Sequence, residues 1–143
     1  MLTMLDADGR FDWRRVHAKK LIQTVAKKVR SYNDQDIRKG RLTYNNKYGC
    51  WSTPLLKVEE VIKLIKTRGV NCHYCKVECV FYRPGPPSRT KCPTLFTLDR
   101  IDNNKTHIIT NCVVCCYQCN IMRSDAFTSE EYKKIKSRLK NIN

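Results

Sequence analysis

Apolar residues recur at helical spacing in the first thirty residues of the chain. In sequence order they fall at the i, i+3, i+4, i+7, i+8 and i+11 positions of one helix face: Ala18, Leu21, Ile22, Val25, Ala26 and Val29. This pattern predicts an amphipathic helix over residues 12–30, with Asp12 as its cap. The opposite face is basic and is a candidate for phosphate contact or for a solvated surface: Arg14, Arg15, Lys19, Lys20, Lys27, Lys28 and Arg30.

A second helix is predicted after the polar, irregular stretch 31–52. Ser52 or Thr53 can cap it, Pro54 suits its first turn, and Gly69 ends it. Its expected apolar face is Leu55, Val58, Ile62 and Ile65.

The second half of the chain changes to a mixed pattern. A basic, proline-rich loop over residues 79–91 precedes two β-rich runs, Thr94–Ile101 and His107–Cys115, with a polar turn at 102–106. Thr128 and Glu131 form a capping box for a last helix, with Phe127 and Tyr132 as its hydrophobic staple. Tyr132, Ile135 and Leu139 give its expected inner face. The order of elements indicates an α+β fold.

The charge of the chain indicates a polyanionic partner. Its 143 residues have a formal charge of +15, and the excess is spread over both halves: 16 basic against 7 acidic residues in 1–69, and 12 against 6 in 70–143. Nucleic acid is the commonest partner of such a surface, although a merely soluble basic protein shares this composition. No apolar run approaches membrane-spanning length, and the N-terminus lacks a secretory pattern, so we expect an intracellular protein with no membrane partner.

Nine cysteines without a secretory signal favour metal ligands over disulfides. Cys72 and Cys75 form one CxxC pair, and Cys116 and Cys119 form a second, which together predict a closed, structural four-thiolate Zn²⁺ site. Cys115, next to the second pair, is the main rival for a ligand position. Of the others, Cys79 and Cys92 could pair or hold a second metal, Cys112 and Cys115 suit a packed core, and Cys50 has no visible partner.

Between the CxxC pairs, and directly after the second pair, lie residues with the chemistry of phosphodiester hydrolysis. A histidine near its ordinary pKa, His107, can deprotonate water. Asp99 and the Asn120 amide oxygen are ligands suited to a hard cation such as Mg²⁺ or Mn²⁺, which would keep sites for water and phosphate. Arg100 can bind a phosphate with two hydrogen bonds.

The motifs CHYC, LDRIDNNKTH, TNCVVCCYQCNIMRSD and FTSEEYKKI, from Cys72 to the last helix, resemble the HNH (ββα-metal) endonucleases of phages and large viruses, in the DRID subgroup. The resemblance implies a zinc-stapled ββα-metal core with an N-terminal helical arm and a C-terminal helix, and cleavage of DNA to 5′-phosphate and 3′-hydroxyl products. It implies that Asp99 and Asn120 bind the catalytic metal, that His107 is the general base, and that Asn111 braces the hairpin. Many members have histidine where this chain has Arg100, and the subgroup usually has glycine where it has Thr106.

These features predict two regions: a basic, DNA-contacting helical arm at 1–69 and an HNH core at 70–143. We expect a metal-dependent endonuclease acting on double-stranded DNA, as a monomer that nicks or a homodimer that cuts both strands. The main alternative is a catalytically inactive HNH-fold protein that binds nucleic acid in a nucleoprotein assembly, which the basic helix and Thr106 also fit. A plain zinc-ribbon interaction module is a further alternative.

Overall fold

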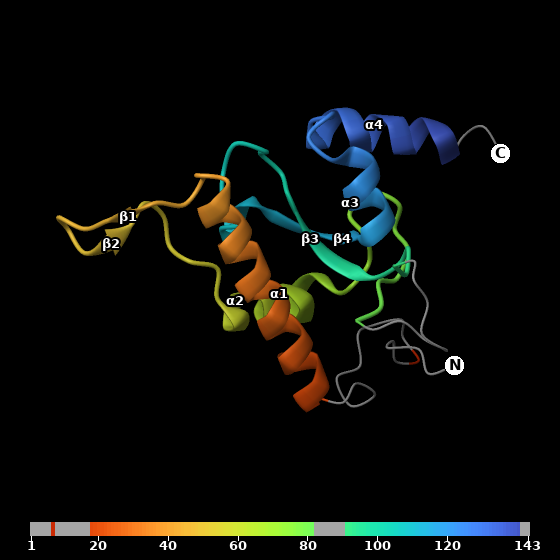
Figure 1. Ribbon diagram of the computed structural model, residues 1–143. Helices are drawn as coiled ribbons and strands as arrows, with labels where there is room; N and C mark the ends of the chain where they lie inside the picture. The colour runs from red at the N-terminus through yellow and green to blue at the C-terminus, as the bar shows by residue number, and fades with distance from the viewer. Residues whose placement is uncertain (1–6, 8–17, 82–90, 141–143) are drawn as a thin grey trace. The chain divides into compact units, whose positions relative to one another are not determined.

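A computed structural model describes residue 7 and residues 18–81 and 91–140 of the chain (Figure 1). The chain divides into two compact units, residues 1–70 and 71–143. Within the described residues there are four α-helices and two two-stranded antiparallel sheets. The predicted α+β class is therefore confirmed. None of these helices is both long enough and apolar enough to cross a membrane.

The first unit is built on two helices, α1 (Ala18–Arg38) and α2 (Val58–Arg68), which contact each other. Its core comprises apolar side chains from both helices and from the chain beside them: Leu21, Val25, Val29, Tyr32, Leu42, Leu56, Val61, Ile65 and Val70. Ile22, expected on the inner face of α1, is half exposed.

Helix α1 continues eight residues beyond its predicted end at residue 30. Tyr32 and Asp36 extend the buried face of Val29 at i+3 and i+7, although an aspartate is not an apolar signal. Burial of the Asp36 carboxylate is offset by an ion pair with the Arg41 Nε at 2.8 Å. The Asp36 carbonyl also accepts the amides of Arg41 and Leu42, which closes the end of the helix. The predicted N-terminal part of this helix, residues 12–17 with Asp12, Arg14 and Arg15, lies outside the described residues.

Helix α2 begins at Val58, so the prediction of a start at Ser52–Pro54 is wrong. Asn33 explains the difference. Its Nδ2 donates to the Leu56 carbonyl and its Oδ1 accepts the Leu56 amide, at 3.1 Å each, and these two hydrogen bonds hold that segment outside the helix. The Lys57 amide then donates to Glu60 Oε1 at the new start. The buried face is accordingly Val61 and Ile65, with Val58 and Ile62 only half-buried. The predicted end at Gly69 is confirmed.

In the chain order of this unit, a short hairpin follows α1 and precedes α2. Strands β1 (Tyr44–Asn45) and β2 (Cys50–Trp51) pair antiparallel, Tyr44 with Trp51 and Asn45 with Cys50. The sequence had indicated irregular chain here. Figure 1 shows the hairpin extending away from the helices of its unit.

The second unit contains a longer hairpin of strands β3 (Phe96–Arg100) and β4 (Cys112–Cys116), in register from Phe96 opposite Cys116 to Arg100 opposite Cys112. Helix α3 (Tyr117–Arg123) follows β4 directly and contacts both strands. The prediction that the return strand begins at His107 is wrong. A 3₁₀ turn, η2 (Ile109–Asn111), precedes β4, and His107 lies in the connection. The central part of the proline-rich loop, residues 82–90, lies outside the described residues.

The last helix, α4 (Ser129–Lys140), starts with the predicted capping box. The Thr128 amide donates to Glu131 Oε1, and the Glu131 amide donates to Thr128 Oγ1, both at 3.1 Å. Its predicted inner face is right only at Tyr132, since Ile135 and Leu139 are 37% and 48% exposed. The helix attaches by its first turn, where Tyr132 packs edge-on against Tyr74 at 4.9 Å between ring centroids.

Gly69 offers a test of how α2 ends. Its φ of 80° and ψ of −166° belong to a region that residues with a Cβ rarely occupy, while no atom lies within 4 Å of the place a Cβ would take. We expect Gly69→Ala to lower the free energy of unfolding by about 1–3 kcal/mol through backbone strain alone. Urea unfolding measures this, with the exposed α2 substitution Lys63→Ala as the control. An unchanged urea midpoint for Gly69→Ala would show that the positive φ of Gly69 does not strain a residue with a Cβ.

Candidate functional site

Four cysteine side chains of the second unit converge, two from its start and two from the junction of β4 and α3. The Sγ atoms of Cys72, Cys75, Cys116 and Cys119 all lie within 4.8 Å of one another. A tetrahedron of Zn–S bonds of about 2.3 Å has edges of about 3.8 Å, and the Cys75 and Cys116 sulfurs are 3.7 Å apart. The four-cysteine cluster is therefore consistent with a structural Zn²⁺ site, as its spacing predicted.

Each cysteine pair is positioned by its own tight turn. In the first, the Lys76 amide donates to the Cys72 carbonyl and Lys76 takes a positive φ of 67°, while the His73 amide donates to Val114 on β4. In the second, Cys116 ends β4 and caps α3, its Sγ accepting the Cys119 amide at 3.4 Å. The hairpin and the first turn are thus joined at the cluster.

The cluster favours thiolate formation at one of its members. Hydrogen bonds from neighbouring thiols, that of Cys115 first and then those of Cys116 and Cys119, lower the pKa of Cys72. A thiolate is the form that binds metal. Tyr132 of α4 borders the same cluster, and burial, followed by the neighbouring Cys119 thiol, raises its pKa. Tyr132 is therefore a neutral neighbour of the sulfurs.

The other described cysteines form no disulfide. Cys115 is buried but lies outside the four-sulfur group, so the structure favours Cys116 over this rival. Cys112 and Cys115 are buried, as expected of core residues. Cys79 is fully buried and Cys92 lies 3.4 Å from Thr94 Oγ1, whereas Cys50 is exposed.

Asp99, near the end of β3, lies in a buried hydrogen-bonded centre. Its Oδ2 accepts the Tyr74 hydroxyl at 2.6 Å and the Arg123 guanidinium Nη1 at 2.7 Å. The Tyr74 hydroxyl is also 2.9 Å from Ser129 of α4. Burial, followed by the hydrogen bond to Asp99, raises the pKa of Tyr74, so this phenol keeps the proton it donates. Both contacts of the carboxylate use the same oxygen.

Arg123 is the residue that the sequence analysis missed. It is 1% exposed, and besides Asp99 it donates to the carbonyls of Arg100 and Ile101 and to Asn103 Oδ1, while its Nε is buried without a partner. It follows Asn120 by three positions on α3 and so lies on the same helix face. That spacing was a signal available in the sequence, but a lysine or arginine is ordinarily exposed.

Asn120 joins α3 to the same strand. Its side-chain amide donates to Thr97 Oγ1 at 3.1 Å and to the Leu98 carbonyl at 3.4 Å. Because Leu98 directly precedes Asp99, these bonds bring Asn120 and Asp99 to one strand–helix junction. Both hydrogen bonds use the Nδ2 of Asn120, so its Oδ1 is the atom that could bind a metal ion.

The connection between β3 and β4 is organised by Asn111. Its Nδ2 donates to the carbonyls of Asp102 and Thr106, at 3.1 and 2.9 Å, and its Oδ1 accepts the Asp102 amide at 2.9 Å. His107, which follows Thr106, is 5% exposed. The backbone that precedes His107 is therefore fixed by a buried side chain.

Arg100 contacts the same connection. Its Nη1 donates to the carbonyls of Asn103 and Lys105, and its Nη2 lies 3.8 Å from the carboxylate of Asp125, a side chain that is 84% exposed. Its guanidinium thus has backbone partners on one side and a weakly held anion on the other.

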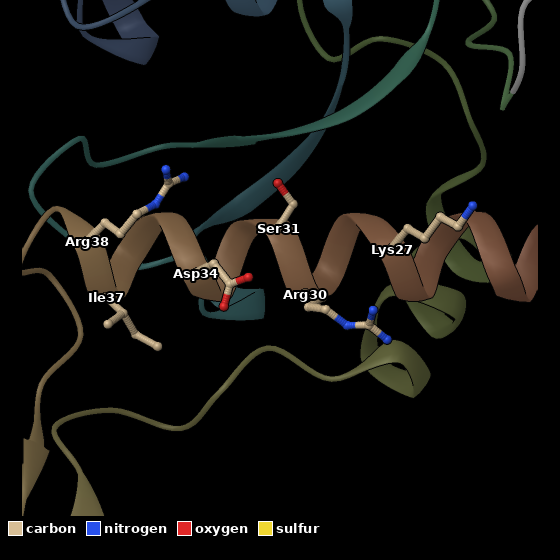
Figure 2. A pocket seen from close by; sticks show the side chains of 6 residues that line it. All are labelled: Lys27, Arg30, Ser31, Asp34, Ile37 and Arg38. Atoms are coloured by element: carbon tan, nitrogen blue, oxygen red, sulfur yellow. The ribbon is translucent and has the colours of Figure 1, made fainter.

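The first unit presents a separate basic groove along α1. A hollow of about 570 Å³ is lined by Lys27, Arg30, Ser31, Asp34, Ile37 and Arg38. Figure 2 shows Lys27, Ser31 and Arg38 on one side of the helix, Arg30 and Ile37 on the opposite side, and Asp34 in front of the helix between the two groups. Of the predicted basic face, Lys27 and Arg30 are exposed and Lys28 is half-buried.

Comparison with known proteins adds no family to this geometry: no protein-family model, no curated protein and no solved structure matches the chain.

The metal centre is tested by replacing one ligand. We expect the purified chain to hold one zinc ion, and Co²⁺ substitution to give the absorption bands of a tetrahedral thiolate site. Cys116→Ser should lose the metal and unfold the second unit, because metal binding contributes directly to folding. Elemental analysis and circular dichroism measure both effects. Cys50→Ser, which removes an exposed thiol outside the cluster, is the matched control and should keep the metal. Full zinc content in Cys116→Ser would refute the ligand set.

The buried Asp99–Arg123 pair is tested by removing the cation. Arg123→Ala leaves a buried carboxylate without its counterion, and we expect a loss of about 3–5 kcal/mol in the free energy of unfolding of the zinc-loaded protein. Urea unfolding measures it, with Arg138→Ala, an exposed arginine of α4, as the control expected to change stability by less than about 0.5 kcal/mol. Equal effects of the two substitutions would show that the pair has no structural role.

Proposed function

We propose that the chain is a metal-dependent HNH-type endonuclease that hydrolyses phosphodiester bonds in double-stranded DNA. One observation supports this most: a β-hairpin is followed directly by a helix packed on it, and Asn120 of that helix donates to Thr97 and Leu98, the two residues of β3 that precede Asp99. This is the strand–strand–helix order that a ββα-metal site requires. The resemblance of residues 72–125 to HNH enzymes gives the same assignment.

The proposed metal site uses atoms that the fold has not already engaged. Tyr74 and Arg123 both bond Asp99 Oδ2, so Oδ1 is the proposed ligand, together with the Asn120 amide oxygen. Carboxylate and amide oxygens are suited to Mg²⁺ or Mn²⁺. A divalent ion held there would stabilise negative charge on the phosphate and on the leaving oxygen.

The remaining roles fall to residues of the hairpin connection. We assign His107 as the base that takes a proton from water. We assign Asn111 as the positioning residue, because it binds the backbone of Asp102 and of Thr106 in the connection that bears His107. Arg100 is proposed to bind the scissile phosphate by exchanging its weak, exposed partner Asp125 for a phosphate oxygen. The basic groove on α1 supplies further phosphate contacts.

A non-catalytic nucleic-acid-binding protein is the second candidate. It is favoured by the engagement of Asp99 with Arg123 and Tyr74, because that carboxylate has a structural role that does not depend on any catalytic metal. The basic charge and the α1 groove fit both candidates equally.

A plasmid nicking assay separates the two candidates. Zinc-loaded protein is incubated with supercoiled DNA with Mg²⁺, with Mn²⁺ or without either ion, beside His107→Ala. We expect ion-dependent conversion to open or linear DNA, a loss of at least about a hundredfold in His107→Ala because the base is gone, and unchanged DNA binding. His17→Ala is the matched loss of another histidine and should cut normally. DNA binding without cutting under either ion would establish the non-catalytic candidate.

A further inference from the structure

The β1–β2 hairpin of the first unit is exposed over nearly its whole length. Residues 43–50 are all exposed, and among them Tyr44 and Tyr48 are 48% and 71% exposed. Tyr44 still contacts Trp51 across the hairpin, but the Tyr48 ring buries little apolar surface and so contributes little to the stability of the fold. The hairpin therefore has features that folding alone does not explain.

The exposed turn of the hairpin is closed by its own hydrogen bonds. Asn45 Oδ1 accepts the amides of Lys47 and Tyr48, at 2.9 and 3.2 Å, and the Gly49 amide donates to the Asn45 carbonyl at 2.8 Å. Gly49 takes a φ of 63°, which suits glycine in the closing position. The backbone that bears Tyr48 is thus closed by hydrogen bonds within the turn.

The aromatic rings and a cation are arranged on this hairpin. Tyr44 and Trp51 meet edge-on with ring centroids 5.1 Å apart, and the Lys47 ammonium lies 5.5 Å from the centroid of the Tyr48 ring. A hollow of about 630 Å³ on the hairpin is lined by Tyr44, Trp51, Asn46 and Lys47 among others. Flat apolar faces, an amide and an ammonium group therefore border one open space.

The segment of chain that contains the hairpin carries only basic charges. Between Asp36 and Glu59 the sequence has five basic residues and no acidic one: Arg38, Lys39, Arg41, Lys47 and Lys57. Of these, Arg41 is paired with Asp36. Such a surface is complementary to a partner that is both anionic and aromatic, which describes a nucleic-acid strand and not an acidic peptide or a lipid surface.

We propose that the β1–β2 hairpin is a nucleic-acid contact element, in which the aromatic rings of Tyr44, Trp51 and Tyr48 stack on unstacked bases of one strand while Lys47, which borders both the hollow and the Tyr48 ring, binds a phosphate of that strand. An aromatic face can stack only on a base whose own face is accessible, as in a single strand or at an opened step of a duplex. This inference takes its partner class from the proposed function, but it requires neither a catalytic metal nor cutting.

Trp51 provides the readout. The chain has two tryptophans, Trp13 and Trp51, so a Trp13→Phe background makes the emission specific to the hairpin. A short oligothymidylate strand and a fully paired duplex of the same length are titrated into zinc-loaded protein without Mg²⁺ or Mn²⁺. We expect quenching of Trp51 that is stronger with the single strand.

Two pairs of variants test the individual contacts. Tyr48→Ala should weaken binding of the single strand about tenfold or more, while Tyr48→Phe keeps the ring and should bind normally. Lys47→Ala should reduce the slope of log affinity against log salt by about one, whereas Lys63→Ala, an exposed lysine of α2, should not. Circular dichroism checks that each variant is folded, which the exposure of Tyr48 leads us to expect.

The outcomes separate this inference from the proposed function. Cutting of plasmid by a protein whose Trp51 emission and Tyr48→Ala affinity do not change would overturn the hairpin contact and leave the nuclease intact. Quenching of Trp51 and weaker binding by Tyr48→Ala, in a protein that never cuts DNA, would support the hairpin contact and refute the nuclease proposal. Equal or stronger quenching by the fully paired duplex would refute base stacking.

Discussion

The buried carboxylate of Asp99 is the contact on which the second unit depends. Through one oxygen it binds Tyr74 of the first cysteine turn and Arg123 of α3, and Tyr74 in turn reaches Ser129 of α4. A strand, a cysteine turn and two helices thus meet at one ionic centre. A buried charge is costly unless it is paired and hydrogen-bonded. Each of these elements therefore depends on the others for its position.

The four-cysteine cluster compensates for the small apolar core of the same unit. Strands of five residues and a helix of seven supply little apolar surface, and much of what is buried consists of cysteine itself. A metal bound by Cys72, Cys75, Cys116 and Cys119 would add its binding free energy to this small core. The cluster joins the start of the unit to the β4–α3 junction, and Tyr74, inside the first CxxC pair, connects it to the ionic centre.

Sequence patterns predicted best where one local rule decides the structure. The cysteine spacing, the stop at Gly69 and the capping box of Thr128 and Glu131 are all confirmed, since each depends on a few neighbouring residues. The errors arose where a distant polar side chain decides. Asn33 sets the start of α2 from 23 residues away, Asn111 fixes the connection that delays β4, and Asp36 extends α1 through an ion pair. Arg123 belongs with these cases: its spacing from Asn120 places it on the same face of α3, but only its distant partners, Asp99 above all, explain why an arginine is buried there.

The ionic centre also constrains how the proposed chemistry would work. With Arg123 already on Oδ2, a divalent ion on Oδ1 would place two cations on a single carboxylate, and their repulsion would weaken metal binding to the free protein. A phosphate brought by DNA supplies the missing negative charge and lowers that repulsion. The metal and the nucleic acid would then bind to the proposed site of the second unit more tightly together than separately.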